Sequence, residues 1–87
     1  MATVFIPPLL RELTGGQTRL SVPGESVREI IAELEKRFPG IEGRLCEGRL
    51  IRPGMAVVVD SEVSTVGLRH KLSEASEVHF LPAISGG

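Results

Sequence analysis

The pattern of hydrophobic and polar positions changes its period several times along these 87 residues. Residues 2–6 form a β-branched and aromatic run that two prolines end, which predicts a strand at the N-terminus. Residues 18–22 follow a Thr-Gly-Gly-Gln turn and alternate polar with apolar, which predicts a second strand, half-buried and paired with the first. A long loop connects the two strands, and we expect three of its leucines to help cover the core: Leu9, Leu10 and Leu13.

The next segment has the pattern of an amphipathic helix. Ser26 and Glu29 have the spacing of a capping box, and Pro-Gly pairs stand before and after the segment. The intervals of three and four between its apolar residues predict one stripe that packs on the core. The residues of this stripe are Val27, Ile30, Ile31, Leu34 and Phe38.

The second half of the chain predicts shorter elements. Residues 41–48 contain a short helical turn in our interpretation, with Ile41 and Leu45 pointing inward. Residues 55–59 are strongly β-prone, and the polar residues 60–62 end this strand.

The last part of the chain holds one ambiguous segment and one clear strand. Residues 63–72 fit either a loop or a short helix, with three apolar anchors: Val66, Leu68 and Leu72. Residues 77–81 predict the final strand, and we expect Pro82 to stop it.

The order of elements predicts an α+β fold: a mixed sheet of four to five strands with one main helix across one face. Alternation along the strands places Val78 and Phe80 toward the helix, and His79 away from it. Phe5 and Leu81 would also point away, toward solvent or a partner. They form an apolar patch in one interpretation and are two scattered surface residues in the other.

Composition narrows the class of protein. The length predicts a single domain over residues 1–87, and a net charge of −1 gives no broad field for nucleic acid or an anionic membrane. The absence of Trp and Tyr removes stacking platforms for single-stranded nucleic acid. No apolar run approaches the roughly 18 residues of a membrane span, and no secretory signal is visible. We therefore expect a cytoplasmic protein.

Side chains with reactive chemistry are few. Cys46 is the one cysteine, and together with His70 and His79 it shows no metal-ligand spacing. No arrangement of Ser, His and Asp marks a nucleophile with its base, so we expect no enzyme active site and no bound metal or cofactor. A lone cysteine in such a chain is usually a packing residue.

The chain ends in Leu-Pro-Ala-Ile-Ser-Gly-Gly, which is either a frayed terminus or a reactive tail. The terminal carboxylate is ionised at neutral pH, and two glycines leave it without neighbouring Cβ atoms, so it could enter a narrow partner site. Exchange of its oxygen for sulfur or nitrogen needs activation, for example by transfer of AMP from ATP. The sequence contains no P-loop, so a separate enzyme would have to supply that step.

Two stretches of the sequence resemble a known family. The order of elements and the ending LPAISGG resemble the MoaD/ThiS group of ubiquitin-like, β-grasp sulfur carriers. Residues 6–17 resemble the pattern I-P-x-x-L-R-x-x-T-G-G-Q of carriers that serve cysteine biosynthesis, which related small modifiers of bacteria and archaea share. The chain departs from the family at residues 60–62, where Asp-Ser-Glu stands in place of an Asn-Gly-like turn.

The resemblance implies where the chemistry lies. In that family an E1-like enzyme of the MoeB/ThiF type adenylates the C-terminal glycine with ATP and Mg²⁺. A sulfur donor then forms a thiocarboxylate, which a sulfur-accepting biosynthetic enzyme consumes. Carried over by position, residues 82–87 are a flexible reactive tail that needs no processing, with Gly87 as the reactive carbonyl and Gly86 as its slender approach. Leu81 and Phe5 would dock the body of the domain, and the partner's channel would be lined by Pro82, Ala83, Ile84 and Ser85.

Three other functions remain open at this point. The chain could be a ubiquitin-like modifier joined to protein lysines through Gly87. It could be the small subunit of molybdopterin synthase, or a binding module with an inert tail. The acceptor of the sulfur is equally open: cysteine, thiamin, molybdopterin, transfer RNA or a secondary metabolite.

Overall fold

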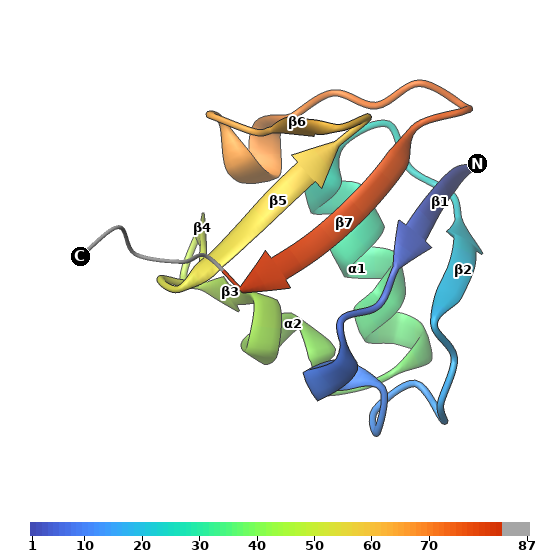
Figure 1. Cartoon of the computed structure of the whole chain (residues 1–87). Helices are drawn as coiled ribbons and strands as arrows, with labels where there is room; N and C mark the ends of the chain where they lie inside the picture. The colour runs from blue at the N-terminus through green and yellow to red at the C-terminus, as the bar shows by residue number, and fades with distance from the viewer. Residues whose placement is uncertain (83–87) are drawn as a thin grey trace.

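The computed structural model describes residues 1–82, and in it five strands form one mixed sheet in the order β2-β1-β7-β5-β6 (Figure 1). β1 pairs in parallel with β7 and antiparallel with β2, while β5 pairs antiparallel with both β7 and β6. The expected mixed sheet is therefore confirmed. Its strands are β1 (Ala2–Phe5), β2 (Arg19–Val22), β5 (Met55–Val59), β6 (Glu62–Val63) and β7 (Glu77–Pro82).

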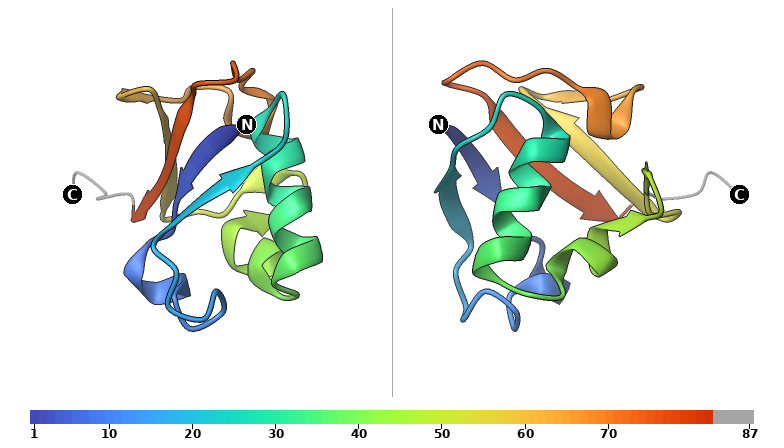
Figure 2. Two further views of the ribbon diagram at one scale, coloured as in Figure 1. Left: turned by 90° about the vertical axis from the view of Figure 1, so that its right-hand side faces the viewer. Right: turned by 180° about the vertical axis from the view of Figure 1, so that it is seen from behind.

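One long helix, α1 (Val27–Arg37), lies across one face of this sheet (Figure 2). The Ser26 hydroxyl accepts a hydrogen bond from the Glu29 N–H at 3.3 Å, so the predicted N-terminal cap is present. Val27, Ile30, Ile31 and Leu34 are buried, and Phe38 packs half-buried at the end of the helix. A second helix, α2 (Ile41–Leu45), buries both of the side chains expected to point inward, Ile41 and Leu45.

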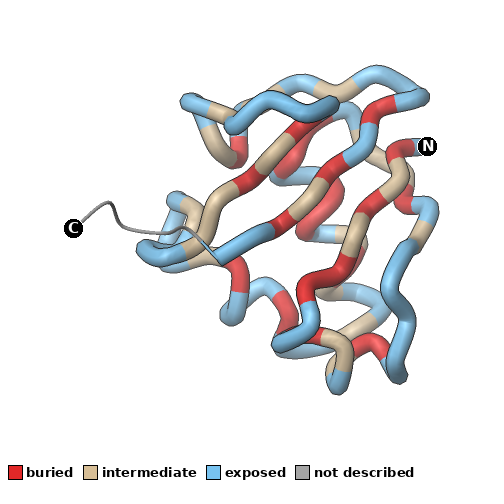
Figure 3. Tube along the Cα trace, in the orientation of Figure 1, coloured by how far each residue is buried: buried red, intermediate tan, exposed pale blue. Residues whose placement is uncertain are grey.

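The core lies between α1 and the sheet. Burial alternates along β1, β5 and β7, as Figure 3 shows, because successive side chains of a strand point to opposite faces. Burying each large apolar side chain contributes about 1.5–3 kcal/mol before the entropy of ordering it is subtracted. The inward sheet residues are Ala2, Val4, Val22, Val57, Val59, Val78 and Phe80.

Two expected core anchors are wrong. Leu9 is 78% exposed and Val66 is 43% exposed. Leu9 lies in the short 3-10 helix η1 (Pro8–Leu10), and Val66 directly precedes the 3-10 helix η2 (Gly67–Arg69). In so tight a turn, residues close in sequence point in different directions, so one side chain faces the core while a nearby one faces solvent. Leu10 and Leu68 occupy the buried positions, with Leu13 and Leu72 packed partly against the core.

Three short strands of the structure were not predicted from the sequence. β3 (Cys46–Glu47) and β4 (Leu50–Ile51) form a separate antiparallel hairpin, and β6 pairs with the end of β5. Each has two residues, which is too short for a periodic pattern.

The expected end of the last strand is also wrong, because Pro82 lies inside β7 and pairs with Met55. Proline cannot donate a ladder hydrogen bond, but its fixed φ suits extended chain, so it can be the last residue of a strand.

Candidate partner-binding site at the end of strand β7

The end of β7 extends beyond the neighbouring strand β1. The β1–β7 ladder stops at the pair Phe5–His79, whereas the β5–β7 ladder continues to Met55–Pro82. The chain leaves the sheet after β1 at two successive prolines, which have no N–H to donate to a strand. Over residues 80–82, β7 is therefore paired on its β5 side only within the described part of the chain.

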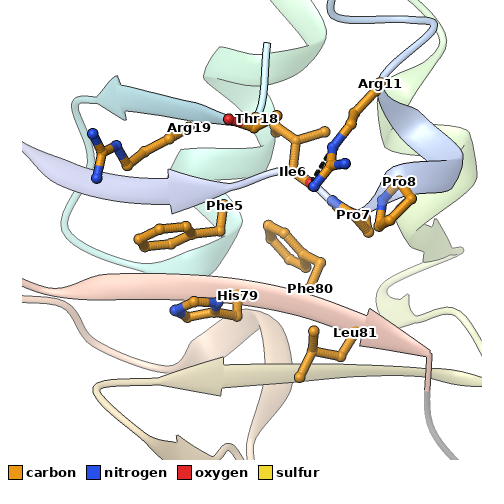
Figure 4. Close-up of a pocket in the computed structure, with 10 residues that line it drawn as sticks. All are labelled: Phe5, Ile6, Pro7, Pro8, Arg11, Thr18, Arg19, His79, Phe80 and Leu81. Atoms are coloured by element: carbon orange, nitrogen blue, oxygen red, sulfur yellow. Dashed lines mark hydrogen bonds between the residues drawn. The ribbon is translucent and has the colours of Figure 1, made fainter. Parts of the chain in front are cut away.

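This divergence opens a pocket of about 340 Å³ beside the end of β7 (Figure 4). Residues 5–8 form one wall and residues 79–81 the other, with Arg11 and Arg19 at the rim. Residues 6–8 and 79–81, which belong to two motif stretches far apart in the sequence, thus meet around one pocket. No acidic side chain is among its lining residues within the described chain, so its charge is positive.

The Thr-Gly-Gly-Gln motif builds the loop next to this pocket. Thr14 is 2% exposed, and its Oγ1 lies 2.9 Å from the carbonyl oxygen of Gln17 and 3.2 Å from that of Arg11. Gly15 and Gly16 have φ values of +66° and +88°, a region that glycine enters without strain. The motif is therefore a turn that holds the pocket wall in place.

Arg11 is fixed by the same loop. Its Nε donates a hydrogen bond to the carbonyl oxygen of Ile6 at 3.3 Å, and its own carbonyl oxygen accepts from the Gly16 N–H at 2.8 Å. Its guanidinium charge is thereby tied to the segment that lines the pocket.

An aromatic pair lies on the outer face of the sheet, away from α1. The rings of Phe5 and His79 stack with their centroids 4.0 Å apart and an angle of 4° between their planes. They are register partners in the β1–β7 ladder, and both are half-buried. Leu81, two residues further along β7, is 45% exposed. The structure thus brings the two expected patch residues to one pocket, with Leu81 more accessible than Phe5.

One further expected site residue lies at the end of β7. Pro82 is exposed at the last position of this strand. The other residues expected in the site lie outside the described residues: Ala83, Ile84, Ser85, Gly86 and Gly87.

Several lining residues were not assigned to the site from the sequence, among them Arg11, Arg19 and His79. Arg11 belongs to the motif that carried the family resemblance, and strand alternation already placed His79 beside Phe5 and Leu81. Only the register between β1 and β7 shows that they share a pocket.

The remaining reactive groups make no second site of this kind. Burial, and to a smaller extent the Glu42 carboxylate, raise the pKa of the Cys46 thiol. The positive charge of Arg28 offsets this only in part, so the thiol is protonated at neutral pH. Among residues 1–82 no three side chains of His, Cys, Asp or Glu gather as metal ligands would. No helix within the same residues has the length and hydropathy needed to cross a membrane.

The five-stranded mixed sheet with α1 across one face and β7 in its centre defines the protein as ubiquitin-like, with a β-grasp fold. The match of a family model to residues 4–87 is more specific: the chain belongs to the ThiS family.

Relatives of known name resemble the chain over its whole length. It is 37% identical over 90 aligned residues to the sulfur carrier proteins CysO of Mycobacterium bovis and Mycobacterium tuberculosis, an alignment that covers 98% of this chain and 97% of each relative.

Solved structures agree with this fold. A chain in the crystal structure of the Amycolatopsis orientalis BexX/CysO complex superposes with a TM-score of 0.89 at 34% identity, with both chains fully covered. The crystal structure of Mycobacterium tuberculosis CysO gives 0.88 at 30% identity, covering 97% of this chain and all of that one. The small archaeal modifier protein 1 of Methanosarcina acetivorans shares the fold, with a TM-score of 0.81 at 22% identity over 99% of this chain and 95% of that one.

Proposed function

We infer that this ThiS-family protein is a sulfur carrier of the type that serves cysteine biosynthesis, with Gly87 as the residue that carries the sulfur. The observation that carries this inference is the full-length identity of 37% to proteins named sulfur carrier protein CysO. The family match extends to residue 87 and so includes the terminal pair of glycines.

The chemistry at Gly87 takes two steps. In the first, a carboxylate oxygen attacks the α-phosphorus of ATP on an E1-like enzyme, and pyrophosphate leaves. In the second, a nucleophilic sulfur from the donor, at the oxidation level of hydrosulfide, attacks the acyl carbon, and AMP leaves. The thiocarboxylate that remains has one sulfur in place of one oxygen. ATP and Mg²⁺ belong to the activating enzyme, since this chain contributes only the carboxylate.

The end of β7 is where a partner would hold the carrier. Leu81 lies six residues before Gly87, so contacts at Leu81 and its pocket would fix the start of the tail while the glycines enter a narrow channel. The positive rim formed by Arg11 and Arg19 suits a partner with an apolar side chain for the pocket and a carboxylate for the rim. The solved complex of a relative with BexX supports the use of protein partners in this family.

Intact-mass spectrometry tests the proposal. The full chain is incubated with the activating enzyme, Mg²⁺-ATP and a sulfide source, and the expected product is heavier by the difference between one sulfur and one oxygen. A variant lacking Gly87 and a variant with one alanine added after Gly87 serve as controls and should not gain this mass. Adenylation of the carrier without any later thiolation would overturn the proposal.

A further inference from the structure

A second charged surface lies on the side of the domain that carries the helices. Four cationic side chains line a pocket of about 560 Å³, with Leu68 as its apolar floor. They come from separate parts of the chain. Arg28 lies in the first turn of α1, Arg49 lies between β3 and β4, Arg69 ends η2, and Lys71 follows it. We define this surface as the basic groove: Arg28, Arg49, Leu68, Arg69 and Lys71.

Charge in the basic groove is not neutralised locally. Within residues 1–82 none of the four cations has a carboxylate oxygen within 4.0 Å, and the ion pair found there is Lys36–Glu33 on α1. The pocket has no acidic lining residue in the described chain. All four cations are solvent-exposed, although the chain as a whole has a net charge of −1. A neighbouring pocket that shares Arg28 and Leu68 with the basic groove is lined by one acidic residue, Glu42, so the unpaired positive charge of the groove rests chiefly on Arg49, Arg69 and Lys71.

Hydrogen bonds hold the walls of the basic groove in place. The Val27 N–H donates to the carbonyl oxygen of His70 at 3.0 Å, which ties the start of α1 to the end of η2. On the other side of η2, the Ser64 hydroxyl accepts from the Gly67 N–H at 3.0 Å and bonds the His70 Nδ1 at 2.8 Å. The groove is thus formed before any ligand binds, which lowers the entropy lost on binding.

Apolar surface continues the basic groove toward β4. An adjoining pocket of about 520 Å³ shares Arg49, Leu68 and Arg69 with it. The same pocket is lined by Leu50 and Val66, which are 72% and 43% exposed. Figure 2 shows α1, η2 and β4 together in the view from behind, and η2 packs on both of the other elements.

This combination of charge and aliphatic surface selects one class of ligand. A single-stranded nucleic acid would need aromatic side chains for stacking, and neither pocket contains one. A free phosphate would use the cations but leave the exposed aliphatic surface uncovered. An acidic polypeptide segment satisfies both, since its carboxylates pair with the cations and its aliphatic side chains cover Leu50 and Val66.

We propose that the basic groove binds an acidic, leucine-containing segment of a partner protein. The groove is lined from α1, the turn between β3 and β4, and η2, whereas the stacked pair Phe5–His79 of the outer face lines the pocket beside β7. The acidic segment can therefore bind while the end of β7 is engaged elsewhere. This binding does not depend on sulfur chemistry at Gly87.

Titration of the ¹⁵N-labelled full chain tests the groove with defined probes. The first probe is a twelve-residue peptide that alternates Glu and Leu, and the comparison probes are the same peptide with Lys for Glu, oligo-dT of equal length, and ATP. We expect amide shifts at residues 66–71, Arg28 and Arg49 with the acidic peptide only, and weaker binding as salt is raised. Stronger binding of oligo-dT or ATP than of the acidic peptide would overturn the proposal, as would shifts confined to other residues.

A matched pair of variants makes the test specific. Reversing two groove charges in R49E/R69E should weaken peptide binding by about tenfold or more, because two attractive pairs become repulsive. R44E changes an exposed arginine of α2 that does not line either pocket and should bind within about twofold of the unmodified chain. An equal loss in both variants would show a general charge effect and overturn the assignment. Their ¹H–¹⁵N spectra report whether each remains folded.

Discussion

Phe5 and His79 stack face to face at 4.0 Å across the only parallel pairing of the described sheet. The pair joins the first strand to the last and stands directly before the point where the chain after β1 turns away from β7. It therefore fixes the inner end of the pocket that borders Leu81.

A double-mutant cycle measures this contact. We expect Phe5→Ala and His79→Ala to destabilise the fold individually, with a coupling free energy of about 0.5–1.5 kcal/mol between them. Urea unfolding of both single variants and the double variant gives the coupling. Additive effects would show that the stacked geometry contributes nothing to stability beyond the area each ring buries.

A substitution at Leu81 tests whether partners dock at the end of β7 without changing the reactive carboxylate of Gly87. Leu81→Asp should raise the KM of the activating enzyme for the carrier by about tenfold and leave kcat unchanged, because it removes an apolar contact and retains Gly87. Val63→Asp is the matched control, since Val63 is also an exposed aliphatic side chain, at 67% against 45%, and lines neither the β7 pocket nor the basic groove and its adjoining pocket. Equal changes in KM for both variants would contradict docking at the end of β7.

Local patterns in the sequence were sufficient to predict the elements that are defined locally. α1 has an N-terminal cap, an apolar stripe and Pro-Gly boundaries in the sequence, and the structure has them too, although the Glu29 carboxylate bonds the N–H of Glu25 rather than that of the cap residue Ser26. β3, β4 and β6 have two residues each, so their formation depends on pairing partners rather than on a pattern of their own. The exposure of Leu9 beside the buried Leu10 has a similar cause, since packing decides which residues of a single 3-10 turn face the core.

The candidate site was predictable in its residues but not in its shape. Strand alternation placed Phe5 and Leu81 on the outer face, and the motif resemblance directed attention to residues 6–17. The pocket itself exists because β7 continues three residues past its last pair with β1. Register between strands more than 70 residues apart has no local signal in a single sequence.

Thr14 provides a test of the Thr-Gly-Gly-Gln loop. Its buried hydroxyl has one proton, which it can donate to the carbonyl oxygen of Gln17 at 2.9 Å or share with that of Arg11 at 3.2 Å. Valine removes this donor, so Thr14→Val should lower the free energy of unfolding by about 1–3 kcal/mol. Thr14→Ser retains the hydroxyl and should lose less. Urea denaturation compares the two, and equal losses would assign the effect to the methyl group instead.

Glu35 should make stability depend on pH in the acid range. Its carboxylate accepts hydrogen bonds from the N–H groups of Gly40 and Glu42, and these bonds hold the pKa of Glu35 below its ordinary value of 4.5. The unfolded chain therefore binds a proton at Glu35 more readily than the native protein does. The resulting stabilisation is complete above about pH 4.5 and is lost as the pH falls through the native pKa of Glu35.

Glu35→Gln removes this titration and should flatten that part of the curve of unfolding free energy against pH. The matched control is Glu12→Gln, an exposed carboxylate with no hydrogen bond in the described part of the chain, which should leave the slope unchanged. The same slope in Glu35→Gln as in the unmodified protein would contradict the assignment.

The backbone of Ser61, in the turn between β5 and β6, has a conformation that glycine would adopt with less strain. Val59 pairs with Glu62, so Asp60 and Ser61 form a two-residue hairpin loop, with φ values of +50° and +73°. A turn with positive φ at both positions favours Asn-Gly or Asp-Gly, and serine at the second position is unfavourable. Ser61→Gly should therefore raise the free energy of unfolding by about 0.5–1 kcal/mol.

Asp60→Gly is the informative comparison at the same turn. The Asp60 Oδ1 accepts a hydrogen bond from the Glu77 N–H at 2.9 Å, so glycine there relieves backbone strain but removes the bond that joins the turn to the start of β7. We expect thermal unfolding to show a higher Tm for Ser61→Gly and no gain for Asp60→Gly. A lower Tm for Ser61→Gly would show that the serine side chain stabilises the turn by more than its backbone conformation costs.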